Sequence, residues 1–288
     1  MPELPEVEAL RGFLAGRLVG SVVGRVQLVS VAALKTYEPG LDAVEGRTVA
    51  GVERYGKFLA LRAGEQLFLV MHLGRAGWVR WREQLPAAPP RPGKGPLALR
   101  VRISPGEAGF DVTEAGSQKH LALYVVRDPQ DVPGIARLGP DPLGEDFTPA
   151  AFAGMLRGER RQIKGVLRDQ SVLAGIGNAY TDEILHAARL SPFQLADALS
   201  EEDVARLYAA VGTTLGEAVE RARGLAPEDL KAEKRTGMRV HGRTGEPCPV
   251  CGDTVREVSF SDSSLQYCPT CQTGGKPLAD RRLSRLLK

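Results

Sequence analysis

The sequence has no apolar run that approaches the length of a membrane helix, and no secretion signal precedes its first charged residues. We therefore expect a cytoplasmic protein without a membrane partner. Cysteine is scarce, since the 288 residues contain only four, all near the C-terminus. Aromatic residues make up 6% of the chain and form no stacking platform of the kind that single-stranded RNA needs, which leaves a zinc-containing RNA binder as a weak alternative.

The four cysteines form two Cys-x-x-Cys pairs, Cys248-Pro-Val-Cys251 and Cys268-Pro-Thr-Cys271, separated by 16 residues. Two thiolates in one tight turn can share a metal ion, and a second pair completes the tetrahedron that zinc prefers. Residues 254–260 and 264–267 alternate in polarity as the two strands of a hairpin would. Disulfides are the alternative, but they suit a secreted protein. We expect one structural zinc ion per chain, held by all four cysteines.

The net charge is only +3, but it is unevenly distributed. Residues 231–288 contain 11 Lys and Arg against 6 Asp and Glu, so the rest of the chain is slightly acidic. A basic C-terminal part that carries a small zinc module favours a polyanionic partner, with nucleic acid first. A solvated, charged surface is the alternative.

The length suits two ordinary domains. The spacing of apolar residues changes once along the chain, from a strand-like pattern to a helix-like one. Short β-type runs predict a sandwich or barrel of six strands, at 21–29, 47–54, 58–62, 66–72, 97–103 and 121–126. A boundary follows near 138–145. Helical periodicity then takes over, at 149–157, 163–169, 179–188 and 201–221.

The first residues of the chain could take part in covalent chemistry. Removal of Met1 would leave Pro2 with a free secondary amine, whose pKa of roughly 7.7–8.0 makes it partly neutral and nucleophilic. Such an amine attacks an electrophilic carbon and forms an iminium. Glu3 could protonate a leaving oxygen, and Glu6 could order the site, at the start of a helix predicted over 6–18. A proline at this position is also compatible with a purely structural role.

Two further features suggest anion binding. Lys57 follows Tyr55-Gly56 at the head of a strand, where a turn could aim its ammonium into a cleft. The loop 174–178 runs into a helix after a basic cluster of Arg157, Arg160, Arg161 and Lys164. Glycines before a helix let backbone N–H groups approach an anion. Both have simpler explanations, a solvent-facing lysine and a plain helix-entry turn.

These motifs occur in one order: Pro2-Glu-Leu-Pro-Glu-Val-Glu8, Lys57, His72-Leu-Gly74, Ile163-Lys164, Asp169-Gln170, Ala174-Gly-Ile-Gly-Asn-Ala-Tyr180, Val240 to Cys248 and the second cysteine pair. In that order the sequence resembles the formamidopyrimidine-DNA glycosylase/endonuclease VIII family, over about residues 1–272. The resemblance implies an α+β multidomain fold, with an N-terminal β-sandwich behind a leading helix, a helix–two-turns–helix domain and a zinc-finger β-hairpin. The implied division is 1–137, 138–235 and 236–273, followed by a basic tail at 274–288.

The resemblance implies a monomeric base-excision repair enzyme that acts on damaged double-stranded DNA, as a glycosylase and as an AP lyase. Pro2 would be the nucleophile, Glu3 the general acid or base, Lys57 a cationic proton donor, and Glu6 an ordering residue. The residues implied in DNA binding are His72, Arg75, Arg160, Lys164, Asn178 and Tyr180. A non-catalytic DNA-binding protein of the same fold is the alternative.

Three departures from the family pattern argue for altered lesion choice more than for lost catalytic chemistry. Ser263 stands where the family has a hairpin arginine assigned to δ-elimination, so cleavage is expected to stop mainly at β-elimination. Arg75 replaces the usual wedge methionine, and either it, Gln118 or Lys119 would have to fill the gap left by a flipped base. The usual Gly-Gly-Thr-Thr-Leu segment is replaced by residues 224–235. The lesion, the opposite base and the role of the tail do not follow from the sequence.

Overall fold

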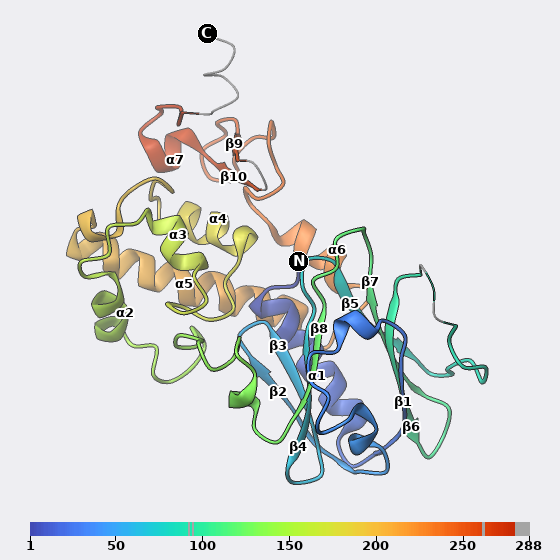
Figure 1. Cartoon of the computed structure of the whole chain (residues 1–288). Helices are drawn as coiled ribbons and strands as arrows, with labels where there is room; N and C mark the ends of the chain where they lie inside the picture. Colours follow the sequence, from blue (N-terminus) through green and yellow to red (C-terminus); the bar gives the residue numbers. More distant parts are fainter. Residues whose placement is uncertain (92, 94, 261–262, 280–288) are drawn as a thin grey trace. The chain divides into compact units, whose positions relative to one another are not determined.

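The computed structural model describes residues 1–91, 93, 95–260 and 263–279. Its contacts divide the chain into two compact units (Figure 1). Unit 1 contains Met1–Leu138 and Ala222–Lys231, and unit 2 contains Gly139–Arg221 and Ala232–Lys288. The sequence placed residues 222–231 with the helical domain, whereas their contacts group them with unit 1. The boundaries drawn from the sequence otherwise stay a prediction, and most of the tail, 280–288, lies outside the described residues.

Unit 1 is a β-sandwich of two antiparallel four-stranded sheets, as predicted. One sheet has the order β1-β6-β7-β5 and the other has the order β2-β3-β4-β8. The strands are β1 (Val22–Leu28), β2 (Val49–Tyr55), β3 (Phe58–Ala63), β4 (Leu67–His72), β5 (Gly77–Arg82), β6 (Leu97–Ser104), β7 (Gly109–Glu114) and β8 (Ala122–Val126). Short 3₁₀ turns, η1 (Val31–Ala33), η2 (Leu41–Val44) and η3 (Pro129–Asp131), lie in the connections.

The sandwich contains two strands that the sequence did not predict, β5 and β7. Their sequences, GWVRWR and GFDVTE, mix charged residues with few aliphatic ones, so neither reads as a buried strand. In β7 the charge is neutralised inside the sheet, because both oxygens of buried Asp111 accept from Arg100 on β6, at 2.8 and 3.0 Å. Pairing of this kind lets a carboxylate enter a core that would otherwise exclude it.

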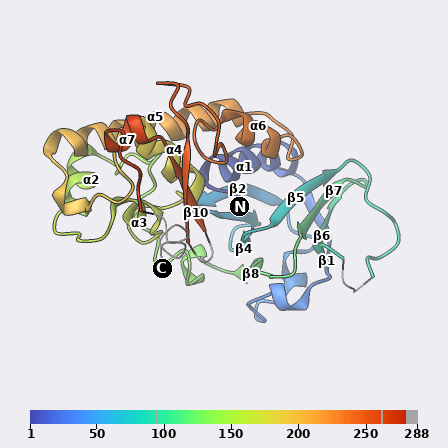
Figure 2. The same cartoon turned by 90° about the horizontal axis from the view of Figure 1, so that it is seen from above.

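Helix α1 (Leu4–Leu18) leads the chain and lies along β2 (Figure 2). Val7, Leu10 and Leu14 follow the 3–4 spacing of one helix face and are fully buried in the same core as both sheets. Burial of each such side chain contributes roughly 1.5–3 kcal/mol. Leu230, from the segment that returns to unit 1, is buried in that core as well.

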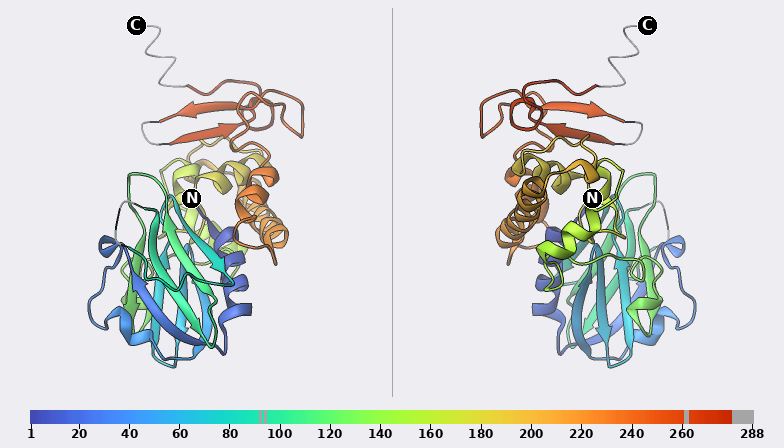
Figure 3. Two further views of the ribbon diagram at one scale, coloured as in Figure 1. Left: turned by 90° about the vertical axis from the view of Figure 1, so that its right-hand side faces the viewer. Right: turned by 90° about the vertical axis from the view of Figure 1, so that its left-hand side faces the viewer.

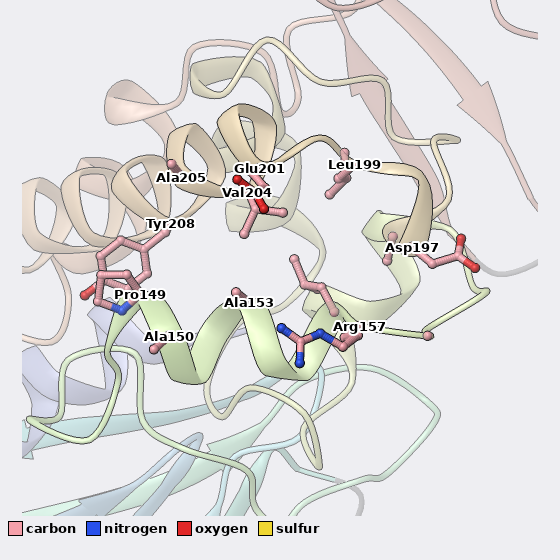
Figure 4. A pocket seen from close by; sticks show the side chains of 13 residues that line it. Pro149, Ala150, Ala153, Arg157, Asp197, Leu199, Glu201, Val204, Ala205 and Tyr208 are labelled. Carbon is pink, nitrogen blue, oxygen red and sulfur yellow. The ribbon is translucent and has the colours of Figure 1, made fainter.

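Unit 2 contains the four predicted helices, two further helices after residue 229 that the sequence did not predict, and the zinc-finger hairpin. The helices are α2 (Pro149–Leu156), α3 (Ile163–Arg168), α4 (Asn178–Ala187), α5 (Glu201–Ala222), α6 (Leu230–Gly237) and α7 (Pro269–Thr273), with a 3₁₀ turn η4 (Ala196–Ala198); the ends of α5 and α6 fall in unit 1. The hairpin pairs β9 (Arg256–Ser259) with β10 (Ser264–Tyr267), which Figure 3 shows side by side. Within the described ranges, no helix has both the length and the apolarity needed to cross a membrane.

Candidate active site and metal centre

The N-terminus of unit 1 is held by a reciprocal cap on α1. Glu3 is the N-cap residue, its side chain accepts from the backbone N–H of Glu6, and Glu6 Oε2 accepts from the backbone N–H of Glu3 at 2.8 Å. Glu3 and Glu6 are 3% and 2% exposed, and Pro2 is buried. Carboxylates at a helix N-terminus are stabilised by its partial positive charge. The cap starts α1 two residues earlier than predicted and fixes the backbone directly after Pro2.

Lys57 lies in the two-residue turn between β2 and β3, where Tyr55 pairs with Phe58 and Gly56 has φ +53°. The lysine is buried, at 8% exposure. An ion pair holds this turn to α1, because Arg54 Nε donates to Glu8 Oε2 at 2.8 Å and Arg54 Nη1 donates to the carbonyl of Gly56 at 3.4 Å. The turn that carries Lys57 is therefore fastened to the first half of the helix that begins with the Glu3–Glu6 cap.

His72 ends β4 directly beside that turn. Phe58, the residue after Lys57, pairs with His72 across the sheet, and their ring centres are 4.6 Å apart. Burial, followed by the charge of the nearby Lys57 ammonium, lowers the pKa of His72 to about 4. His72 is consequently a neutral imidazole at physiological pH, able to donate a single hydrogen bond.

Arg75 is exposed in the loop after β4. At Gly74, with φ +58°, a Cβ atom would lie 2.7 Å from the carbonyl carbon of His120, so the loop 73–76 lies against the loop 115–120. The second loop is anchored by Glu114 Oε1, which accepts from the backbone N–H groups of His120 and Leu121 at 2.6 and 3.0 Å. Arg75, Gln118 and Lys119 therefore come from adjacent loops of unit 1.

In unit 2, Asp182 of α4 joins three partners. Its carboxylate forms an ion pair with Lys164, lies 2.7 Å from His241 Nδ1, and accepts from the backbone N–H of Gln266 at 3.2 Å. Lys164 is only 6% exposed and Asp182 only 1%. The Lys164 ammonium, which was predicted to bind phosphate, is thus partly neutralised by Asp182 inside the protein and donates a hydrogen bond to it.

Asn178 is the first residue of α4 and connects its loop to the hairpin, since Nδ2 donates to the carbonyl of Ser264 at 2.8 Å. Its Oδ1 atom is buried, and it has no partner among the described residues. Gln170 shapes the loop, accepting from the N–H of Gly175 at 2.9 Å and donating to the carbonyl of Ile176 at 2.7 Å. Arg160 is exposed. Tyr180 is 2% exposed and its ring lies 4.7 Å from Lys234 Nζ, so the ring is packed inside the protein and its assignment to DNA binding stays a prediction.

The four cysteines converge as predicted. Their sulfur atoms all lie within 4.8 Å of one another, with Cys251 and Cys268 at 3.4 Å and Cys248 and Cys271 at 3.9 Å. Four sulfurs at the usual Zn–S bond length form a tetrahedron with edges of about 3.8 Å, so the cluster fits one zinc ion. A site closed by four thiolates has no open position for chemistry, and its zinc is structural.

Helix α4 supports this metal centre through contacts that no sequence motif indicated. Glu183, 4% exposed, accepts three backbone N–H bonds from Arg239, Val240 and His241, at 2.8 to 2.9 Å. His186, one turn further, places Nε2 3.3 Å from the sulfur of Cys248. Both residues lie on the helix predicted from periodicity alone, but their partners are more than 50 residues away.

Comparison with known proteins agrees with this architecture. Residues 1–113 match the formamidopyrimidine-DNA glycosylase N-terminal domain, residues 138–227 its H2TH domain, and residues 245–274 the zinc finger found in FPG and IleRS. These matches, together with the four-cysteine cluster, define a zinc-finger DNA-repair glycosylase.

Relatives extend the likeness over nearly the whole chain. A formamidopyrimidine-DNA glycosylase of Symbiobacterium thermophilum is 34% identical over 98% of this chain and 93% of its own length. An uncharacterized formamidopyrimidine-DNA glycosylase-like protein of Mycobacterium tuberculosis is 60% identical over 52% of this chain and 94% of its own. The Lactococcus lactis enzyme, solved non-covalently bound to DNA containing an AP site, superposes with a TM-score of 0.81 at 27% identity, covering 94% of this chain and 99% of its own. The chain belongs to the formamidopyrimidine-DNA glycosylase family, which confirms the resemblance, the fold class and the zinc site inferred from the sequence.

Proposed function

We propose that this chain excises damaged, oxidised bases from double-stranded DNA and then cleaves the abasic site, with Pro2 as nucleophile. The supporting observation is the buried Glu3–Glu6 cap, which fixes the backbone after Pro2, together with the Arg54–Glu8 ion pair that fastens the Lys57 turn to the same helix. A rigidly held amine, with a buried cation on a turn fastened to the same helix, suits covalent capture of a sugar carbon. Met1 is 51% exposed and therefore accessible for removal.

In the proposed reaction, the Pro2 nitrogen attacks C1′ of a nucleotide flipped out of the duplex. The bond to the base breaks, and the base leaves with a proton, as Glu3 and Lys57 serve proton transfer at the sugar and leaving group. The proline nitrogen loses its proton, the C1′–O4′ bond breaks as O4′ takes up a proton, and the ring-opened iminium that results acidifies C2′. Loss of a C2′ proton then expels the 3′ phosphate by β-elimination, and hydrolysis returns the free amine. Glu6 acts as a positioning residue through its hydrogen bond to the Glu3 backbone.

We assign DNA binding to residues on both units. His72 and Arg75 come from unit 1, and Arg160, Lys164 and Asn178 come from unit 2. Flipping a base costs a few kcal/mol, so phosphate contacts of this kind are needed to hold the distorted strand. The substrate is chromosomal DNA, and we propose that the protein acts on it as a monomer in the cytoplasm.

Borohydride trapping on a duplex with one abasic site tests the proposal. The processed chain should form a covalent adduct, and a chain whose N-terminus is blocked by an uncleaved tag should form none. A chain with a free Pro2 that binds abasic DNA but leaves no adduct would contradict catalysis and favour a non-catalytic DNA-binding role.

A further inference from the structure

A cavity lies on unit 1, between β5 and residues 228–231, which include the start of α6. It has a volume of about 430 Å³ and is lined by Trp78, Arg80, Trp81, Arg82, Glu228 and Lys231. One wall is fixed by a hydrogen bond from Trp78 Nε1 to the carbonyl of Pro227, at 2.9 Å. Lys231 Nζ lies 4.5 Å from the centre of the Trp78 ring. The residues that the sequence analysis placed in catalysis or DNA binding do not line it.

The cavity has an excess of positive charge. Three cations and one carboxylate line it, and among the described residues Arg80, Arg82 and Lys231 have no carboxylate oxygen within 4.0 Å. Asp111 pairs with Arg80 across the sheet, but both its oxygens are held by Arg100. Partial burial, followed by the charge of Arg80, lowers the pKa of Lys231. Uncompensated cations at one cavity attract an anion.

Aromatic surface lies beside these cations. Trp81 is partly exposed, packs edge-to-face on Phe13 with ring centres 6.2 Å apart, and is oriented by a 2.8 Å hydrogen bond from its Nε1 to Glu83. The guanidinium of Arg17 adds a further cation 5.6 Å from the Trp81 ring. Indole rings next to guanidinium groups suit a ligand with a flat base and a phosphate, since a base stacks on such a ring and the cations bind the phosphate.

The cavity is separate from the proposed catalytic residues. Phe13, which packs against Trp81, follows Glu3 by ten residues along α1, a rise of about 15 Å. Trp81 is likewise four residues along β5 from the loop that carries Arg75, about 13 Å. A nucleotide in this cavity would therefore not be the one undergoing reaction.

We propose that this cavity binds a nucleotide, with its phosphate among Arg80, Arg82 and Lys231 and its base against Trp81. The nucleotide is either free or part of a DNA strand held away from the catalytic residues, and only in the second case does the inference rest on the proposed function.

The chain's only two tryptophans, Trp78 and Trp81, both line the cavity, so intrinsic tryptophan fluorescence reports on it directly. The full chain is titrated with dGMP, with a short single-stranded oligonucleotide and with inorganic phosphate, and free tryptophan corrects for absorbance. We expect saturable quenching by a nucleotide ligand. Quenching by dGMP identifies a free nucleotide, and quenching by the oligonucleotide alone identifies a strand. Inorganic phosphate should compete without quenching as strongly, because it lacks a base.

Arg80→Gln should weaken nucleotide binding at least tenfold. Arg25→Gln removes the same charge from an exposed position on β1, at the opposite edge of the same sheet, and should leave binding unchanged. Trp81→Phe provides a second variant that retains an aromatic ring and all the cations, and it should bind more weakly while Trp78 still reports. Thermal melting checks that each variant folds. Absence of saturable quenching by any nucleotide ligand, or an equal effect of Arg80→Gln and Arg25→Gln, would overturn the inference.

Borohydride trapping of the same proteins separates the two proposals. If wild-type protein forms the adduct but shows no quenching, the cavity assignment alone fails. If it is quenched by dGMP but forms no adduct, the repair function fails and the cavity assignment stands.

Discussion

His186 Nε2 lies 3.3 Å from the sulfur of Cys248, inside unit 2. Burial, followed by the charges of Arg239 and Arg189, lowers the pKa of His186 to about 4. A metal-bound thiolate can only accept a hydrogen bond, so the hydrogen atom of the ring lies on Nε2. The other ring nitrogen, Nδ1, is buried and has no partner in the described part of the chain. An N–H···S bond of this kind orients a ligand and reduces the charge on its sulfur.

His186→Phe should therefore weaken zinc retention. It keeps an aromatic ring on α4 but removes the donor, and we expect zinc release to a chromogenic chelator to become about tenfold faster or more. His120→Phe, at an exposed histidine of unit 1, is the control and should release zinc at the wild-type rate. Equal release rates for the two variants would show that the histidine does not support the metal.

Glu6→Ala should destabilise the fold and slow covalent capture. It leaves the buried backbone N–H of Glu3 without its acceptor, at a cost of about 1–2 kcal/mol. It also frees the backbone next to Pro2, so the rate of borohydride trapping should fall at least tenfold. Glu6→Gln retains an acceptor oxygen and should lie between Ala and wild type. Unchanged urea unfolding and trapping in Glu6→Ala would contradict the positioning role.

His72 should make stability depend on pH. Its pKa of about 4 lies below the ordinary value of 6.5, so the unfolded chain takes up a proton first as the pH falls. The free energy of unfolding should decrease from about pH 6.5 to pH 4, by at most about 3 kcal/mol from this residue, and then level off. In His72→Gln this contribution is absent. A difference between the two proteins in urea unfolding that stays constant across the window would refute the assignment.

Ser263→Arg should change the products of strand cleavage. Serine offers no fixed positive fork for a phosphate, and arginine does. We expect wild-type protein to end mainly at the β-elimination product and the arginine variant to give more δ-product, resolved on a denaturing gel. Ser263→Ala is the control and should match wild type. Dominant δ-product from the wild-type chain would show that the arginine is dispensable.

The structural elements that the sequence predicted correctly are those that depend on the spacing of residues close together in the chain. The cysteine pairs, the periodic helices and the strands rich in Val, Leu and Ile each carry their signal within a few residues. The strand with Trp78 and Arg80 was missed because it lies at a sheet edge and bears charge, and the strand with Asp111 was missed because its neutralising Arg100 lies on another strand.

Long-range partners also account for what could not be predicted at the site. Nothing near Glu183 in the sequence indicates that its oxygens accept N–H bonds from residues 239–241. Lys164 was assigned to phosphate binding from the family resemblance, and its buried partner Asp182 lies 18 residues further along. Tyr180 belongs to a motif that the family resemblance associated with DNA, but its ring is internal.

Because the hairpin is attached to α4, the zinc finger is not a self-contained module. Asn178, Asp182, Glu183 and His186 all come from one ten-residue helix. Together they contact six residues beyond residue 238, namely Arg239, Val240, His241, Cys248, Ser264 and Gln266. A peptide cut out at 236–273 would retain its four thiols and lose every one of these supports. As a graft onto another protein, the finger would have to bring α4 with it.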